Sequence, residues 1–526
     1  MCAINGFALL NSWYQPSHVK KMNAANRFRG PDKTDWWHDK HISLGHNLLS
    51  ISGDIETSQQ PYVTKKGNVF VYNGEWFDHT GYDTEYLAEM IDYHGIEYLN
   101  DINAQFGLAW YDKENCRVTI ARDHFGIKPV FYYLKDGKFY FSSSIHGLRE
   151  CVNIVPDEEQ LMKSNKKGFF YEGNFTPYKN IHVLSPGEYI TVCLKRVKEI
   201  ARGSFHDYQL DTIDMKDRDV KKLIIEAIEQ VGYSQNQIAL ALSGGLDSST
   251  IASVLKSSNP LCITNKYVWP GLEDQKMDIY SKDFALANRT AEEYGLKMVH
   301  AECNHLNHAD LENGVAQSSL LPLQDFDRQV ARFVFCRETK RQGIKVLLTG
   351  DGADEIFTGY SGHNRLYEWT DERLVQFIRN RLEEKRKDQI SFPEHVLGRD
   401  IRNNYLFLEL FRLVNTYNLT MDAHSGFHGV ESRVPFLHQK LVRTMLSIPS
   451  EKKLRLMPEL DLKLRANTKF YLRSLFKKNL PEHVLTRNQK AGCCLPWNSL
   501  YPSRSMQSKR EIVQKIRPLL GHHKLI

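Results

Sequence analysis

The chain has 526 residues, too many for one ordinary hydrophobic core, and this length predicts two large domains or three smaller ones. Hydrophobic residues make up 41% and charged residues 25%, a balance that is typical of folded globular proteins and excludes disordered and low-complexity classes. The net charge of +6 comes from scattered basic residues, so we expect a solvated surface and no nucleic-acid partner.

Signals for a membrane or for export are missing from the sequence pattern. No run of about 18 apolar residues occurs, and the N-terminus lacks a basic stretch followed by an apolar one. The nine cysteines are odd in number and widely spread, which is typical of a reduced protein. We therefore expect no membrane partner and a cytoplasmic location.

The first 200 residues or so indicate short strands separated by turns, with one helical pattern at 84–93. Asn73-Gly74 follows an apolar run and predicts a tight turn. We expect an α+β domain with packed sheets. The predicted strands are 68–72, 117–121 and 139–141.

The character of the sequence changes near residue 205. A helical pattern at 220–231 precedes a buried apolar run at 237–242, which ends in Ser-Gly-Gly, and a second such run at 344–348 ends in Thr-Gly-Asp-Gly. Strands that lead through glycine loops into helices predict a parallel sheet with helices on its faces. From about residue 360 onward, helical patterns dominate. We expect domains at 1–205 and 206–526.

Cys2 is the first candidate for chemistry. Removal of Met1 would leave a residue that carries both a thiol nucleophile and an α-amine able to act as its base. Asn73 and Gly74 offer an amide and a backbone N–H for an oxyanion, and Glu75 offers a carboxylate for a substrate ammonium. Taken alone, Cys2 is better explained as a chance cysteine, and Asn73-Gly74 is equally well explained as a hairpin turn.

Several strings in this region resemble the class II glutamine amidotransferase domain: MC at 1–2, RGPD at 29–32, LGHNLLSI at 44–51, NGE at 73–75, NDINAQF at 100–106 and ARDHFGIKP at 121–129. The resemblance implies an Ntn-hydrolase-type αββα sandwich. It also implies that Cys2 attacks the glutamine carboxamide and that Asn73 and Gly74 bind the oxyanion. Glu75 and Asp101 would hold the substrate ammonium.

The chain departs from that pattern at four positions. The most consequential is Leu48, which stands where the family has an arginine that pairs with the glutamine carboxylate. We therefore expect glutamine to bind weakly unless another cation substitutes. The other departures are Ala3, Ala104 and Ser144.

A second candidate site follows the strand predicted at 237–242. Glycines let the backbone approach phosphates, and a helix N-terminus supplies donors to anionic oxygens. The string at 243–249, SGGLDSS, lacks the Gly-Lys-Ser/Thr ending of a Walker A loop and resembles the PP-loop of enzymes that split ATP into AMP and pyrophosphate. The predicted ATP-binding residues are Leu242, Ser243, Gly244, Gly245, Asp247, Ser248, Ser249 and Gly350.

Together with TGDGADEIFTGY at 349–360, GVESRVPFL at 429–437, KFYLR at 469–473 and RNQK at 487–490, this loop resembles the synthetase domain of asparagine synthetase B-type enzymes. The resemblance implies a ligase in which a carboxylate attacks the α-phosphorus of ATP and ammonia then displaces AMP. Asp247 and Asp354 would bind Mg²⁺, and Asp351 and Lys490 would be catalytic.

Departures cluster where the resemblance places the acyl acceptor. Thr-Gly-Asp-Gly replaces Ser-Gly-Glu-Gly, and Gln324-Asp325-Phe326-Asp327 replaces a segment with two threonines and an arginine. The segment at 422–427 also differs, and His438 replaces an aspartate. Because an arginine is lost and Asp325 and Asp327 are gained, we expect aspartate to be a poor substrate.

Three functions remain open from the sequence. The first is a glutamine-dependent amide synthetase acting on small-molecule substrates, with a homodimer compatible with the resemblance. The second is a related synthetase that joins the activated carboxylate to a different or intramolecular amine. The third is a non-catalytic binding protein on a decayed scaffold. The presence of Cys2, Asn73, Asp247, Asp354 and Lys490 together favours the first.

Overall fold

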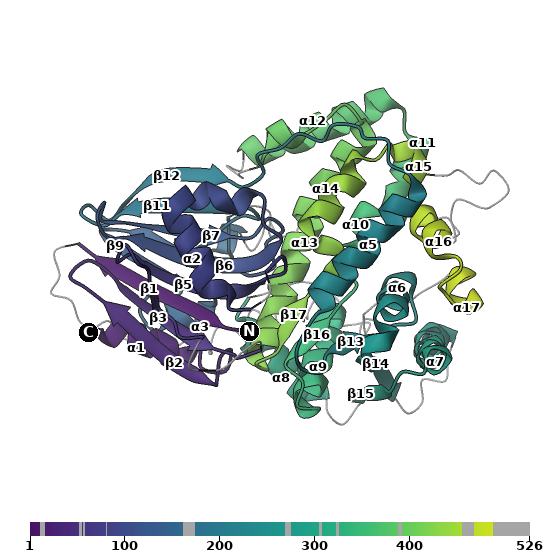
Figure 1. Ribbon diagram of the computed structural model, residues 1–526, viewed down its shortest axis with the longest axis horizontal. Coiled ribbons are helices and arrows are strands. Elements are labelled where there is room, and N and C mark those ends of the chain that lie inside the picture. The colour runs from purple at the N-terminus through teal and green to yellow at the C-terminus, as the bar shows by residue number, and fades with distance from the viewer. Residues whose placement is uncertain are drawn as a thin grey trace.

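A computed structural model of the chain describes residues 1–10, 16–51, 55, 58–79, 81–160, 174–268, 275–304, 308–321, 326–387, 392–454 and 468–487. Figure 1 shows two layered sheets on one side, a parallel sheet with its helices on the other, and helix α13 (Ile401–Phe427) between them.

The N-terminal part contains two antiparallel sheets, each six-stranded within the described residues. The first sheet has the order β10 (His182–Val183), β8 (Phe131–Lys135), β9 (Lys138–Ser142), β1 (Ala3–Leu9), β3 (Ser43–Leu48) and β2 (Lys33–His38). The second has the order β12 (Lys198–Ser204), β11 (Glu188–Cys193), β7 (Arg117–Arg122), β6 (Ala104–Asp112), β5 (Val69–Trp76) and β4 (Tyr62–Val63).

Alternation of side chains along the strands explains why these sheets stack. The inward residues form an apolar core that includes Ile4, Val71 and Ile120. Helices α1 (Ser17–Ala25) and α3 (Ile145–Arg149) pack on the outer face of the first sheet, and α2 (Asp83–His94) packs on that of the second. The result is the αββα sandwich that the sequence predicted.

One local prediction was wrong. Asn73-Gly74 does not form a turn: both residues lie inside β5, where Asn73 pairs with Gly107 and Gly74 with Phe106. Pairing with β6 along the whole of β5 outweighs the local turn preference of the dipeptide. A glycine suits position 74 for another reason, since a Cβ there would collide with the Gln105 carbonyl and the Tyr72 ring.

The C-terminal part contains a five-stranded sheet within the described residues, and every pair of neighbouring strands is parallel. Apolar clusters lie on both faces, under helices of both sides, as the sequence predicted. The strand order is β15 (Met298–Asn304), β14 (Leu261–Val268), β13 (Ala239–Ala241), β16 (Val346–Leu348) and β17 (Glu431–Arg433).

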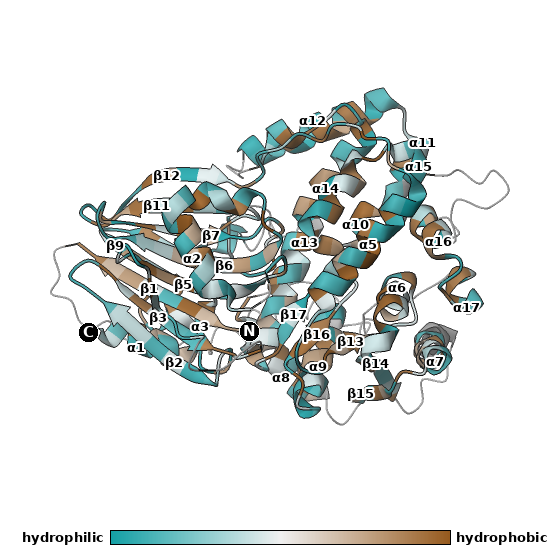
Figure 2. Cartoon of the chain, viewed as in Figure 1, coloured by the Kyte–Doolittle hydropathy of each residue, from teal (hydrophilic) through white to brown (hydrophobic). Residues whose placement is uncertain are grey.

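Helices cover this sheet and extend beyond it. Figure 2 shows that α12 on the outside is largely hydrophilic, and none of the described helices is long and apolar enough to cross a membrane. The longer helices besides α13 are α5 (Asp217–Gly232), α6 (Leu246–Leu255), α7 (Gln275–Tyr294), α8 (His308–Ser319), α9 (Phe326–Arg341), α12 (Asp371–Lys387) and α14 (Gln439–Ser447). The shorter ones are α10 (Ala353–Ile356), α11 (Arg365–Glu368), α15 (Ser450–Lys453), α16 (Phe470–Phe476) and α17 (Glu482–Leu485).

The two parts are joined by buried polar contacts as well as by apolar packing. Arg29 of the sandwich forms an ion pair with Asp422 of α13 at 2.9 Å, and the two side chains are 1% and 2% exposed. The Asn418 amide, also on α13, donates to the Phe125 carbonyl at 2.9 Å. These contacts fix the sandwich against the central helix.

Breaking the Arg29–Asp422 pair is expected to destabilise the protein strongly. Arg29→Met leaves the Asp422 carboxylate buried without its partner, a change that typically costs about 3–5 kcal/mol in the free energy of unfolding. Chemical denaturation measures this change. Lys452→Met removes the exposed pair with Asp214 and should leave the free energy of unfolding nearly unchanged. Equal effects of the two variants on the free energy of unfolding would contradict a stabilising role of the buried Arg29–Asp422 pair.

Candidate active site

Cys2 lies immediately before β1, and the N-terminus lies at the junction of the two parts (Figure 1). The Cys2 side chain packs against the apolar cluster that includes Leu49 and Phe125. The Leu49 N–H donates to the Cys2 sulfur at 3.4 Å. Burial raises the pKa of the Cys2 thiol and lowers the pKa of the Met1 amine to about 5. In the chain with Met1 the Cys2 nitrogen is a peptide amide, so the Cys2 α-amine becomes available as a base only when Met1 is removed.

Two donors for an oxyanion come from β5. The Asn73 side chain is fully buried, and among the residues that the structure describes neither its amide nitrogen nor its amide oxygen has a hydrogen-bond partner. The Phe106 N–H donates to the Asp123 carboxylate, and the Phe106 carbonyl accepts from the Asp123 N–H. Gly74 faces Phe106 across the ladder and therefore forms no backbone hydrogen bonds with it, so the Gly74 N–H points away from β6. An unsatisfied buried amide calls for a ligand or water in that place.

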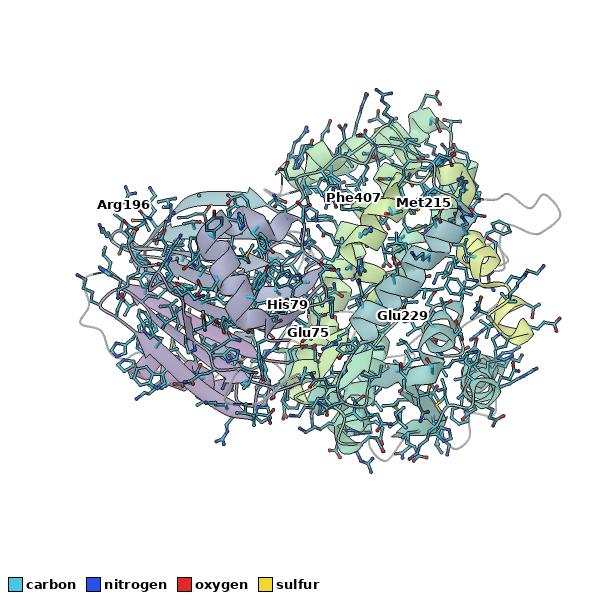
Figure 3. The ribbon with its side chains drawn as sticks, viewed as in Figure 1. Glu75, His79, Arg196, Met215, Glu229 and Phe407 are labelled. Carbon is cyan, nitrogen blue, oxygen red and sulfur yellow. The ribbon has the colours of Figure 1, made fainter. Side chains whose placement is uncertain are left out.

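Glu75 lies on the same face of β5 as Asn73, at the edge of the sandwich that faces the second part of the chain (Figure 3). Its carboxylate forms an ion pair at 3.2 Å with Arg433, which comes from β17. Burial raises the pKa of Glu75, Arg433 lowers it, and Glu431 and Asp83 raise it. Glu431 and Asp83 also raise the pKa of the Cys2 thiol, so Cys2 and Glu75 share one charged environment.

The structure also places Asp101 and Leu48, two further residues that the sequence singled out. The Asp101 side chain is 88% exposed and faces Arg443 at 3.4 Å, on the surface between the two parts. Leu48 is buried at the end of β3 and leaves no cation at its position.

The predicted phosphate loop has the expected form. Strand β13 ends at Ala241 and α6 begins at Leu246, so Asp247 lies in the first turn of α6. Gly244 has a φ of +63°, which glycine adopts readily. The Ser243 N–H and hydroxyl both contact the Ser248 hydroxyl at 3.2 Å. The loop lies where the strand order reverses between β13 and β16, the usual ligand position in such sheets.

The two predicted metal ligands converge on one lysine. Asp247 accepts from Lys469 at 2.5 Å, and Asp354 of α10 pairs with the same ammonium at 2.8 Å. Lys469 is 4% exposed in its side chain, so the ion triad is shielded from water. Gly350 packs directly against Asp247, because a Cβ at position 350 would contact the Cβ of Asp247.

The remaining predicted residues divide into two groups. Asp351 lies beside this triad and pairs with Arg332 of α9 at 2.8 Å. Arg487, the first residue of the RNQK string, contacts the Ser243 carbonyl at 3.3 Å and so places the start of that string beside the phosphate loop. Lys490 lies outside the described residues.

Sequence reasoning gave no role to several residues that the structure places at the sites. Lys469 was only the first letter of a matching string, and its contact with Asp247 spans 222 positions. Gln105 was likewise part of a string, yet it pairs with Glu75 across the β5–β6 ladder, and its buried side-chain amide has no hydrogen-bond partner within the described part of the chain. Arg332 carried no signal beyond its place in a helical pattern. The charge of Lys469, inside a string that resembles the family, was the available hint.

Comparisons with known proteins give a match for each of the two parts of the chain. Residues 219–515 match the asparagine synthase family, and residues 1–202 match the glutamine amidotransferase domain. Asparagine synthetase 1 of Bacillus subtilis is 23% identical over 573 residues, 95% of this chain and 87% of its own. Asparagine synthetase B of Escherichia coli is 24% identical, with 88% and 76% covered. The amidase chyE of Penicillium rubens is 26% identical, with 63% and 53% covered.

The chain belongs to the asparagine synthase family, because that family matches more than half of its length. It is a ligase of the amidotransferase type, with an asparagine synthetase-like pairing of a glutamine amidotransferase domain and a synthetase domain.

Proposed function

We propose that the chain is a glutamine-dependent, ATP-consuming amide synthetase with a glutaminase domain at 1–205 and a synthetase domain at 206–526. The observation that carries the proposal is the convergence of Asp247 and Asp354 on Lys469 at the ends of β13 and β16. Family membership and the buried environment shared by Cys2 and Glu75 support the glutaminase half. A cytoplasmic location and a homodimer stay predictions from the sequence.

In the glutaminase domain, the Cys2 sulfur attacks the side-chain carbonyl carbon of glutamine. The oxygen of that carbonyl becomes an oxyanion, for which the Asn73 amide and the Gly74 N–H are the available donors. The carbon–nitrogen bond then breaks, and the amide nitrogen takes the proton given up by the thiol and leaves as ammonia. Water then cleaves the thioester, which releases glutamate and restores the thiol. Glu75 holds the ammonium of glutamine when it is released from Arg433.

In the synthetase domain, a carboxylate oxygen of the acceptor attacks the α-phosphorus of ATP and pyrophosphate leaves. Ammonia then attacks the acyl carbon and AMP leaves, which gives the amide. Lys469 supplies a fixed positive charge beside the phosphates as negative charge shifts to the leaving group. Asp351 and Lys490 are the further catalytic residues that the resemblance implies.

The residues at this site fit Mg²⁺. Two carboxylates that approach one ammonium closely enough to share it are also placed to share one divalent cation, and Mg²⁺ typically uses one or two carboxylates together with substrate phosphates. Asp247 and Asp354 would hold the metal. When bound, it would neutralise phosphate charge and orient the triphosphate.

Transfer of ammonia between the domains requires that both sites open toward a shared interior. Cys2 packs against the apolar cluster that also contains Leu242 and Leu246 of the phosphate loop region. This continuity supports our proposal that ammonia crosses inside the interface, where exclusion of water protects the activated acyl group.

A product assay tests the proposal. The full chain is incubated with ATP, Mg²⁺, ammonium and a panel of carboxylic acids, and the nucleotide products are separated. We expect AMP and pyrophosphate in equal amounts, dependent on one class of acid. ADP and phosphate as products would contradict the assignment of the loop at 243–249. The panel must be broad, because one relative bears the name amidase, so family membership alone does not name the acceptor.

A further inference from the structure

Gln105 is the second residue of β6, and its side chain is fully buried. Within the described part of the chain, neither its amide nitrogen nor its amide oxygen has a hydrogen-bond partner. A primary amide offers two donors and two acceptor positions, and leaving them unused in the protein interior costs free energy. The Gln105 amide therefore suits contact with a small polar molecule better than it suits apolar packing.

The register of the sheet places Gln105 beside the candidate glutaminase site. Gln105 pairs with Glu75 on β5, and Asn73 lies two residues away on the same face of that strand. The residue directly opposite Asn73 is Gly107, which has no side chain. Asn73 and Gln105 are therefore diagonal neighbours, with α-carbons about 7–8 Å apart. Because Asn73 is a donor to the oxyanion in the proposed reaction, Gln105 lies close to the place where ammonia is formed.

Gln105 also lies at the end of β6 that meets the second part of the chain. Two residues earlier, the Asn103 side-chain oxygen accepts from the Gln439 N–H of α14 at 3.1 Å. Across the ladder, Glu75 forms its ion pair with Arg433 of β17. Gln105 is thus buried at the junction of the two parts, on the side of the sandwich from which ammonia must leave.

The surroundings of Gln105 are charged, whereas Gln105 itself is neutral. Arg433 contacts Glu75 at 3.2 Å and Glu431 at 2.8 Å. Ammonia is a nucleophile only while the lone pair of its nitrogen is free, and a carboxylic acid group can protonate it. A carboxylate offers only acceptors and a lysine only donors, but an amide offers both and transfers no proton. Gln105 is therefore suited to hold ammonia in its reactive form.

We propose that the side-chain amide of Gln105 binds the ammonia released at Cys2 and holds it, unprotonated, at the start of the path between the domains. The amide oxygen accepts one N–H of ammonia, and the amide N–H donates to the ammonia nitrogen. No covalent bond forms or breaks in this step. The inference rests on the proposed function, since it requires the glutaminase reaction, and it adds a binding site for the transferred molecule.

Parallel measurement of glutamate and AMP tests the inference. The full chain receives saturating glutamine, ATP, Mg²⁺ and the acid that gives the fastest ammonium-driven pyrophosphate release. That acid is chosen by assay, because the side chains of Asp325 and Asp327, on which the expectation about aspartate depends, lie outside the described residues. The ratio of AMP to glutamate reports the fraction of released ammonia that reaches the second site.

Gln105→Met keeps the length of the side chain and removes both polar atoms. The ratio of AMP to glutamate should fall by about 2- to 10-fold, the effect of losing one neutral hydrogen bond, and free ammonia should rise to balance it. The rate at saturating ammonium should stay unchanged. The free energy of unfolding should not fall, because no hydrogen bond within the described part of the chain is lost. Gln105→Asn keeps the amide and should restore part of the ratio.

Thr119→Val is the matched control. It removes a buried hydroxyl from the same sheet, where Thr119 contacts the Thr191 hydroxyl at 2.9 Å, and should leave the ratio of AMP to glutamate unchanged. An unchanged ratio in Gln105→Met overturns the inference, and so does an equal fall in Thr119→Val.

A second variant covers the case in which Gln105→Met does not fold. Gln105→Glu has nearly the same shape, and its carboxyl group would protonate ammonia and lower the ratio of AMP to glutamate. An unchanged ratio in Gln105→Glu again counts against the inference. If the unmodified chain forms AMP with ammonium but no glutamate from glutamine, the glutaminase half of the proposed function fails together with this inference. If it forms both products at a ratio that no Gln105 variant changes, this inference alone fails.

Discussion

Replacing Cys2 with alanine is expected to abolish glutamine-dependent amide formation and to leave ammonia-dependent formation intact. Cys2 lies in the sandwich, whereas the phosphate loop and Lys469 lie in the parallel-sheet part. Loss of the nucleophile removes the thioester route, a loss on the order of 10³-fold or more in kcat. Externally supplied ammonia bypasses that route and requires only the second site.

The measurement compares pyrophosphate release driven by glutamine with release driven by ammonium chloride in the same preparation. Cys193→Ala is the matched control, because Cys193 lies in the same sandwich, on β11, away from the candidate site. It should preserve both activities. Parallel loss of both activities in Cys2→Ala, with Cys193→Ala unaffected, would refute the model of two separate sites.

The features that the sequence predicted well are those with local signals. The loop at 243–249 was recognisable because an apolar strand, two glycines and a helix follow one another directly, and the structure places them so. Helix α2 at Asp83–His94 follows its apolar period closely. In both cases, the residues that determine the structure are neighbours in the chain.

The features that the sequence missed depend on distant contacts. Asn73-Gly74 has a strong local preference for a turn, but pairing with β6 determines its conformation. The position of Glu75 beside Arg433 joins strands of two different parts of the chain. No pattern in either segment contains that information, because the contact is created only when α13 and β17 pack against the sandwich.

The cations of the second site were also hard to predict from the sequence. From the sequence, Lys490 was the cation assigned to catalysis, and Lys469 had no role. The backbone of Lys469 has a φ of +56°, a left-handed conformation that is uncommon outside glycine, and its ammonium lies between Asp247 and Asp354. A residue in a strained conformation that pairs with two acids is typical of a functional site, but neither property can be derived from the neighbouring residues in the sequence.

Asp247→Asn is expected to lower ammonia-driven pyrophosphate release by about 100-fold or more, the usual effect of deleting one electrostatic contact at a reacting phosphate or oxyanion. The amide keeps the size of the side chain and removes its charge, so the two-carboxylate arrangement for Mg²⁺ loses one ligand. Lys469 retains its pair with Asp354, and the fold of the loop is therefore preserved. Asp354→Asn should act in the same way.

The assay titrates Mg²⁺ at saturating ATP, ammonium and acceptor, so that weaker metal binding and a slower chemical step are separated. If Asp247 is a metal ligand, the concentration of Mg²⁺ that gives half-maximal rate rises along with the fall in kcat. Asp214→Asn is the control, because Asp214 is an exposed acid that pairs only with Lys452 among the described residues, and it should change neither quantity. A normal Mg²⁺ dependence in Asp247→Asn, with kcat reduced, would instead assign Asp247 to the orientation of Lys469 rather than to the metal.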